Sequence, residues 1–181
     1  MRATRMITAL LFLWMTACDS SGPELSGEFT LSSELYGTTS YYLYGYHYGD
    51  GAFYKYPGGG TLPDIINEGY LVNVDSVSTS VPGFHTPGQV NGFALAGSFQ
   101  SAGEAKAYFD GFTSVDSAYL FDILSDPVEL HQVWIQKTSS GNYVKLLVKK
   151  ITSVDPEFEK AYNEVLLEYS YQPDGSTVFP E

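Results

Sequence analysis

A row of aromatic side chains between residues 41 and 48 is the strongest indication of chemistry in this sequence. Four tyrosines stand at every second position, namely Tyr42, Tyr44, Tyr46 and Tyr48. Because side chains alternate between the two faces of a strand, a strand over residues 40–48 would place all four on one face. A flat, rigid ring with a polar tip stacks well on sugar rings and planar ligands, and it also suits a hydrophobic core. The row is therefore either a binding surface or part of the core.

The opposite face of that strand favours the core interpretation. Leu43 is its only aliphatic side chain, beside Tyr41, Gly45 and His47. The even face has more ring area to bury, so we expect the four even tyrosines to face the core and His47 to lie on a wetter face. An exposed even row would instead form an aromatic patch of the kind that marks binding sites.

Histidine and carboxylate side chains form no recognisable catalytic or metal-binding motif. The three histidines, His47, His85 and His131, are not spaced as metal ligands. Carboxylate pairs such as Asp122 with Asp126 are expected by chance among 21 acidic residues. The chain has neither a Gly-x-Ser-x-Gly elbow nor a phosphate-binding loop. We therefore expect a protein that is not an enzyme and holds no metal, with His47 and His85 able to join the tyrosines in a ligand site.

The N-terminus has the three parts of a secretory signal peptide. Arg2 and Arg5 precede an apolar run over residues 7–15, and two small residues follow that run. A run of this length cannot span a membrane, which takes about 20 residues, so we expect residues 1–17 to be removed. The next residue is Cys18, the only cysteine of the chain, so no disulfide can form within the chain.

Residues 15–18, Met-Thr-Ala-Cys, resemble the lipobox of bacterial lipoproteins, although that family usually has Leu where this chain has Met15. The resemblance implies cleavage before Cys18, a diacylglycerol on its sulfur and an acyl group on the new amine. Two or three acyl chains hold a protein firmly to a bilayer. We expect a lipid-anchored envelope protein, at the outer membrane or cell surface rather than the inner membrane. Residues 18–27 are small and polar and should form a flexible tether.

Composition after the signal peptide limits the partners. Loss of Arg2 and Arg5 lowers the basic count from 9 to 7 against 21 acidic residues, which leaves a net charge of −14. Such a surface repels phosphate backbones, so nucleic acid is not an expected partner. The remaining length fits one domain, residues 28–181.

The predicted fold is mostly β, an antiparallel sheet or sandwich with one packed α-helix over about residues 102–110. Tyrosine, phenylalanine and glycine are abundant, and they favour strands and turns. Ser101 and Glu104 fit a capping box at the start of the helix. Alternating patterns predict strands elsewhere, over residues 28–35, 40–48, 52–56, 70–77, 130–137, 142–152 and 165–171. Residues 81–92, rich in proline and glycine, are expected to form a loop, and Trp134 to anchor the core.

Three C-terminal segments resemble a pattern of uncharacterised surface lipoproteins from Bacteroidetes-like bacteria. They are residues 131–138 (HQVWIQKT), 141–148 (GNYVKLLV) and 169–176 (YSYQPDGS). A more distant similarity is to the HmuY haem-binding lipoproteins, which are also β-rich and hold haem with a histidine pair. Neither haem ligand of that family aligns with a histidine of this chain.

These observations lead to one main functional prediction and two alternatives. The main prediction is a membrane-anchored, non-catalytic binding or accessory module without a cofactor, for a glycan, a planar small molecule or a partner protein. The first alternative is haem capture of the HmuY kind. The second is an envelope hydrolase, for which the sequence offers no candidate site.

Overall fold

A computed structural model describes residues 24–74, 77–89, 91–125, 127–154 and 161–180. The predicted signal peptide, Cys18 and the first part of the tether lie outside the described residues. The predicted tether, residues 18–27, extends too far, because strand β1 (Ser26–Ser32) begins inside it. Just before β1, the Leu25 carbonyl accepts a hydrogen bond from the Tyr171 backbone N–H at 2.7 Å, so this segment already belongs to the sheet.

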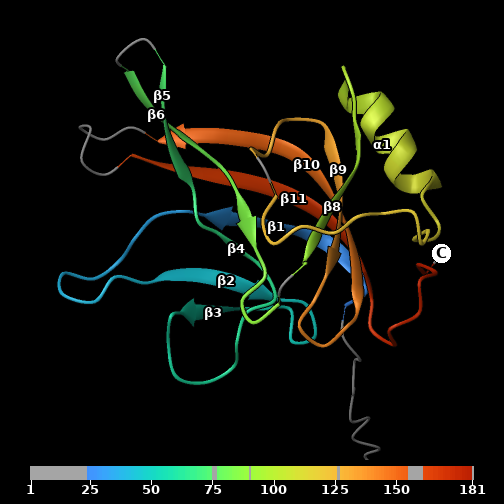
Figure 1. The fold of residues 1–181 in the computed structure, drawn as a ribbon, viewed down its shortest axis with the longest axis horizontal. Helices are drawn as coiled ribbons and strands as arrows, with labels where there is room; N and C mark the ends of the chain where they lie inside the picture. The colour runs from blue at the N-terminus through green and yellow to red at the C-terminus, as the bar shows by residue number, and fades with distance from the viewer. Residues whose placement is uncertain (1–23, 75–76, 90, 126, 155–160, 181) are drawn as a thin grey trace, which may run out of the picture.

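A five-stranded antiparallel sheet forms the centre of the fold, in the order β1-β11-β10-β9-β8. Its other strands are β8 (Phe93–Ser98), β9 (Gln132–Lys137), β10 (Tyr143–Val154) and β11 (Tyr162–Gln172). In Figure 1 the long strands β10 and β11 cross the middle of the molecule. The tight turn between β9 and β10 has Gly141 at a φ of 85°, a backbone conformation that favours glycine. The predicted mostly-β fold with antiparallel sheet is confirmed.

Helix α1 (Ala102–Gly111) covers one face of the sheet, as predicted. Ser101 caps it, because its hydroxyl accepts a hydrogen bond from the Glu104 backbone N–H at 3.3 Å. The helix buries Ala105 and Phe109 against Val133 and Leu147 of the sheet. Next to it, the segment over residues 112–121 and the C-terminal residues pack on the same face around Ile135.

The main core lies on the opposite face of the sheet. Leu146 and Val148 of β10 and Leu167 and Tyr169 of β11 point into it, and Trp134 joins them from β9. Trp134 is 5 % exposed, which confirms it as a core residue. Its indole N–H donates to the Gln132 side-chain oxygen at 2.9 Å, so the ring is buried without an unsatisfied donor.

Two short strand pairs cover this core, to which they contribute Tyr46 and Phe84. They are the hairpin of β2 (Leu43–His47) with β3 (Ala52–Tyr56), and the pair of β4 (Ile66–Asn67) with β7 (Phe84–His85). Figure 1 shows β2 and β3 below the sheet. Strand β2 contacts both β1 and β4. The hairpin therefore has a neighbour on each side near its turn.

Two sequence predictions on this side of the molecule are corrected, and one strand of the central sheet was missed. The strand expected over residues 70–77 is a hairpin of β5 (Tyr70–Val74) and β6 (Val77–Val81). The expected loop over residues 81–92 contains β7. Strand β8 was not predicted, because its sequence FALAGS has small residues, and an irregular register between Leu95 and Gly97 breaks the alternation.

Candidate functional site

The tyrosine row of β2 runs from the core to the surface. Tyr46 and Tyr48 are buried, whereas Tyr44 is 42 % exposed and Tyr42 is half-buried. The prediction that all four even tyrosines face the core is therefore right for Tyr46 and Tyr48, wrong for Tyr44 and only half met for Tyr42. Strand β1 covers only the end of the hairpin near the turn, so the other end of the row reaches solvent.

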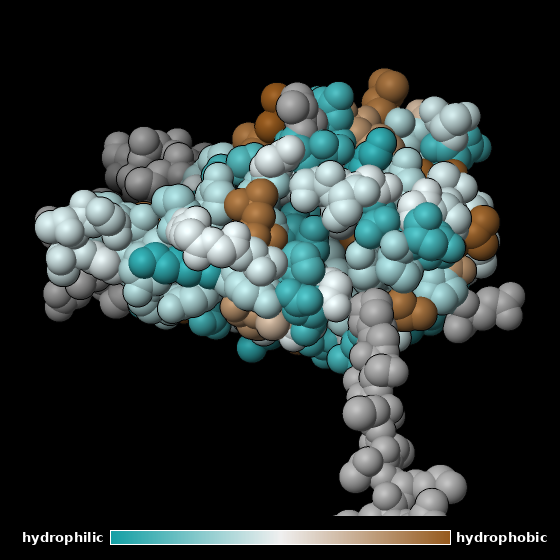
Figure 2. Space-filling view, turned by 90° about the horizontal axis from the view of Figure 1, so that it is seen from below, coloured by the Kyte–Doolittle hydropathy of each residue, from teal (hydrophilic) through white to brown (hydrophobic). Residues whose placement is uncertain are grey.

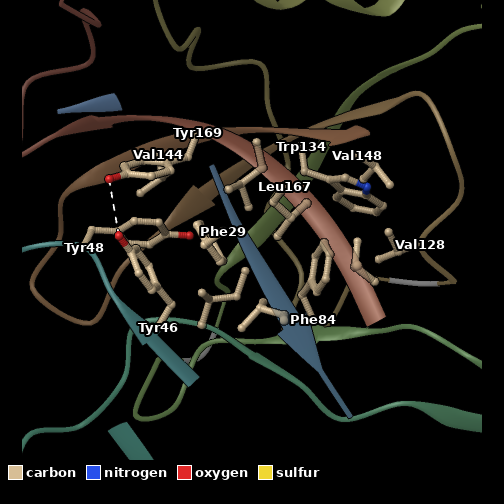
Figure 3. Close-up of a cluster of buried hydrophobic side chains, with 14 of the residues drawn as sticks. Phe29, Tyr46, Tyr48, Phe84, Val128, Trp134, Val144, Val148, Leu167 and Tyr169 are labelled. Atoms are coloured by element: carbon tan, nitrogen blue, oxygen red, sulfur yellow. Dashed lines mark hydrogen bonds between the residues drawn. The ribbon is translucent and has the colours of Figure 1, made fainter. Parts of the chain in front are cut away.

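The buried half of the row is part of the aromatic core (Figure 3). The Tyr46 ring stacks on Phe29 of β1 with centroids 4.1 Å apart and an interplanar angle of 8°. The Tyr48 hydroxyl donates to the Gln136 side-chain oxygen at 2.7 Å. The Gln136 amide in turn donates to the Asp64 carbonyl at 2.6 Å and the Thr86 hydroxyl at 2.8 Å. Burial raises the pKa of Tyr48 well above its usual value, so this ring is a structural donor.

Tyr36, from outside the hairpin, packs against Tyr42 and Tyr44 in the surface half of the row. Tyr36 forms an isolated bridge with Tyr42, with backbone hydrogen bonds of 2.8 and 3.0 Å in the two directions. The Tyr36 and Tyr42 rings stack with centroids 5.8 Å apart, and Tyr44 meets both edge-on at 5.6 and 5.8 Å. We call Tyr36, Tyr42 and Tyr44 the tyrosine cluster. Three rings that contact one another at the surface leave each side chain little freedom to rotate.

Charged groups flank the tyrosine cluster on two sides. Lys55, opposite Tyr44 in the hairpin, places its Nζ 3.9 Å from the Tyr42 ring centroid, a cation–π contact. Glu34 accepts a hydrogen bond of 2.6 Å from the Tyr36 hydroxyl. This bond to a carboxylate raises the pKa of Tyr36 to about 12, so the phenol stays protonated. The cluster thus presents ring faces together with hydroxyl, carboxylate and ammonium groups.

The surface around the hairpin is mixed rather than apolar. Figure 2 views the molecule from the side of β2 and β3, and its brown, apolar residues appear there as small separate groups among teal and white ones. Phe53 of β3 is 46 % exposed and lies on the same hairpin face as Tyr44. Aromatic side chains, with polar groups beside them, are therefore the main feature of this surface. It suits a ligand that has both flat faces and hydrogen-bonding edges.

The opposite face of β2 is more buried than the sequence predicted. Leu43 is 5 % exposed, and a Cβ on Gly45 would lie 2.5 Å from the Ile65 carbonyl oxygen. The segment leading into β4 covers this face at Gly45, which explains the correction. His47 is partly accessible, as expected. Its Nδ1 lies 3.2 Å from Asp50 and its Nε2 lies 3.9 Å from Asp64.

His85 lies apart from this group, in the β4–β7 pair. Its Nδ1 lies 3.1 Å from a Glu68 carboxylate oxygen. The prediction that His47 and His85 could join the tyrosines is not supported by shared contacts, since each histidine contacts its own carboxylates. Within the described ranges, no group of three or more His, Cys, Asp or Glu side chains is arranged to hold a metal ion.

The sequence analysis missed Tyr36, Lys55 and Glu34. Tyr36 meets Tyr42 only because the intervening turn has Gly37 at a φ of 99°. The Tyr44–Lys55 pairing depends on the hairpin register. The short Gly49-Asp50-Gly51 turn could have predicted that register, because it limits how the two strands can pair.

Comparison with protein-family models, curated proteins and solved structures gave no match for this chain. Among the described residues, no helix has the length and hydropathy needed to cross a bilayer.

Proposed function

We propose that this protein is a lipid-anchored, non-catalytic binding module of the bacterial cell envelope, and that the tyrosine cluster holds a sugar ring of a glycan. The observation that carries the proposal is the arrangement of Tyr36, Tyr42 and Tyr44. Three rings contact one another at the surface, on a strand whose next two even tyrosines are fixed in the core. Side chains held in this way lose little entropy when a ligand binds.

The polar groups beside the rings favour a sugar over a purely apolar planar ligand. A sugar ring offers a C–H face that stacks on an aromatic ring and hydroxyls at its edge that need hydrogen-bond partners. Glu34 beside Tyr36 and Lys55 beside Tyr42 are suited to accept from and donate to such hydroxyls. A site lined only by apolar groups would lack this specificity.

The anchor in the proposal depends on the N-terminal sequence. A lone cysteine follows a charged start, a short apolar run and two small residues. This order is typical of an exported lipoprotein. The acidic mature chain would place the binding domain away from an anionic membrane surface, at the end of the tether.

A titration with a neutral β-linked glucose hexamer tests the binding site. We expect the full chain in detergent micelles to bind it by calorimetry, and Tyr44→Ala to weaken binding about tenfold, as the loss of one stacking ring predicts. Tyr41→Ala is the matched control, because Tyr41 is a neighbouring tyrosine that is 61 % exposed and outside the cluster. Equal loss of affinity in both variants, or no change in Tyr44→Ala, would contradict the proposed site. Failure to bind this hexamer and a chitin hexamer would contradict the glycan class.

A further inference from the structure

A cavity lies on the face of the central sheet that α1 covers, at the ends of β9 and β10. Its volume is about 450 Å³, within the range of small-molecule sites. Three aromatic residues line it, together with Lys137, two side-chain amides and one leucine; they are Tyr119, Phe121, Tyr143, Gln89, Asn91 and Leu120. The tyrosine cluster belongs to the opposite side of the sheet, so this cavity is a separate feature.

Lys137 is the one cationic residue among those that line the cavity. Of the six lysines in the described part of the chain, only Lys106 and Lys149 form an ion pair with a carboxylate. Within the described part of the chain, Lys137 has no carboxylate oxygen within 4.0 Å of its Nζ. Its Nζ lies 5.9 Å from the centroid of the Tyr143 ring. Lys137 is half-buried, and its ammonium is therefore available to an anionic group.

Backbone hydrogen bonds fix the polypeptide around Lys137. The Lys137 backbone N–H donates to the Gly92 carbonyl at 2.7 Å, and Lys137 pairs with Tyr143 in the sheet. Asn91, next to Gly92, has a φ of 106°, a strained conformation for a residue with a side chain. Strained residues of this kind cluster at ligand sites.

The other side chains of the cavity suit a sugar ring. The Phe121 and Tyr143 rings lie 6.2 Å apart at 55° and form an aromatic corner. Within the described ranges, the side-chain amides of Gln89 and Asn91 have no hydrogen-bond partner in the protein. Each amide can both donate to and accept from ligand hydroxyls. The cavity thus offers aromatic faces, two side-chain amides and the Lys137 ammonium. These groups are complementary to a sugar ring that carries hydroxyls and one carboxylate.

We infer that this cavity binds a carboxylated sugar, such as a hexuronate unit of an acidic polysaccharide. The carboxylate would pair with Lys137, the ring would lie against Tyr143 and Phe121, and its hydroxyls would meet Gln89 and Asn91. The attraction acts over a short range, because charges in solvent that are more than about one Debye length apart, roughly 8–10 Å, are largely screened by salt. The cavity therefore selects an acidic sugar by a local contact. This inference stands independently of the glycan site proposed at the tyrosine cluster.

The test compares two ligands that differ in one group. The full chain in detergent micelles is titrated by calorimetry with a galacturonate trimer and with the neutral galactose trimer. We expect the acidic trimer to bind about tenfold more tightly, and added salt to reduce this difference. Lys137→Gln should remove the difference while leaving the melting temperature unchanged. Lys150→Gln makes the same charge change on an exposed residue of β10 and should leave the difference intact.

Repeating the titrations in Tyr44→Ala separates the two sites. The preference for the acidic trimer should persist there if it arises in the cavity. The inference is overturned if the wild type binds both trimers equally or binds neither. It is also overturned if Lys150→Gln acts like Lys137→Gln, or if Tyr44→Ala abolishes the preference.

Discussion

Tyr44 and Tyr46 point to the same face of β2, yet Tyr44 is 42 % exposed and Tyr46 is 6 % exposed. The difference comes from Phe29, which stacks on Tyr46. We therefore expect Tyr46→Ala to lower the free energy of unfolding by about 3–5 kcal/mol, the usual cost of removing a buried aromatic ring. Tyr44→Ala should cost less than about 1 kcal/mol. Urea unfolding of the two variants measures the contrast, and equal destabilisation would show that the cluster is part of the core.

The Gln136 side chain should be important for stability although it is polar. It is fully buried, accepts from the Tyr48 hydroxyl and donates to Asp64 and Thr86. Gln136→Leu would leave buried groups without partners and should cost about 2–3 kcal/mol. Adding Tyr48→Phe to this variant should cost less than Tyr48→Phe does in the wild type, because the hydrogen bond is already lost. Gln100→Leu, at an exposed position, is the control and should be nearly neutral.

Asp64 makes stability depend on pH. Burial raises its pKa above the ordinary value of 3.8, although the Tyr48 N–H and His47 oppose the shift and Asp50 adds to it. Between pH 3.8 and the higher pKa of Asp64 in the folded state, the folded protein binds more protons than the unfolded protein. The free energy of unfolding therefore falls as the pH rises through the pKa that Asp64 has in the folded state. We expect Asp64→Asn to raise the melting temperature relative to wild type at about pH 7, with a smaller gain at about pH 4. The exposed variant Asp122→Asn should lack this trend, and a constant effect of Asp64→Asn across the range would argue against it.

Trp134 provides a spectroscopic probe of the core. The only other tryptophan is Trp14, in the predicted signal peptide. Because Trp134 is buried, fluorescence of a chain lacking the signal peptide should be blue-shifted when folded and poorly quenched by iodide. Trp134→Ala should cost about 3–5 kcal/mol. Ready quenching in the native protein would place the ring in solvent and contradict its position in the core.

The anchor prediction concerns Cys18. Wild-type protein should incorporate labelled palmitate and fractionate with membranes, since acyl chains on this residue would hold it there. Cys18→Ser should incorporate no palmitate and accumulate as the uncleaved precursor. Normal processing and membrane binding of Cys18→Ser would refute the lipoprotein assignment.

The regular parts of this fold could be predicted from the sequence because their patterns are local. The face shared by Val165, Leu167, Tyr169 and Tyr171 follows from strand periodicity, and all four are buried in the main core. The helix start follows from the Ser101 cap. Such signals depend on residues two to four positions apart, so they survive without knowledge of the tertiary structure.

The candidate sites depend on contacts between distant segments, which the sequence alone does not provide. Nothing in the spacing of Tyr44 and Tyr46 shows that Phe29 covers only one of them. The cavity at Lys137 likewise joins Gln89 and Asn91, residues 119–121 and Tyr143, from three separate parts of the chain. Burial and ligand access are set by such tertiary contacts, so they could be decided only with the structure.

Strand β1 also has a mechanical consequence. It connects the proposed anchor to the rest of the domain, and it lies at the edge of the sheet, paired along its whole length with β11 from Ser26–Ser170 to Ser32–Glu164. A pulling force between the lipid anchor and a glycan bound to the domain would act on the domain at the N-terminal end of β1. A pull along the strand axis loads all of these backbone pairs together in shear, whereas a perpendicular pull would open them one after another. The domain should therefore resist traction best when its ligand pulls in line with β1.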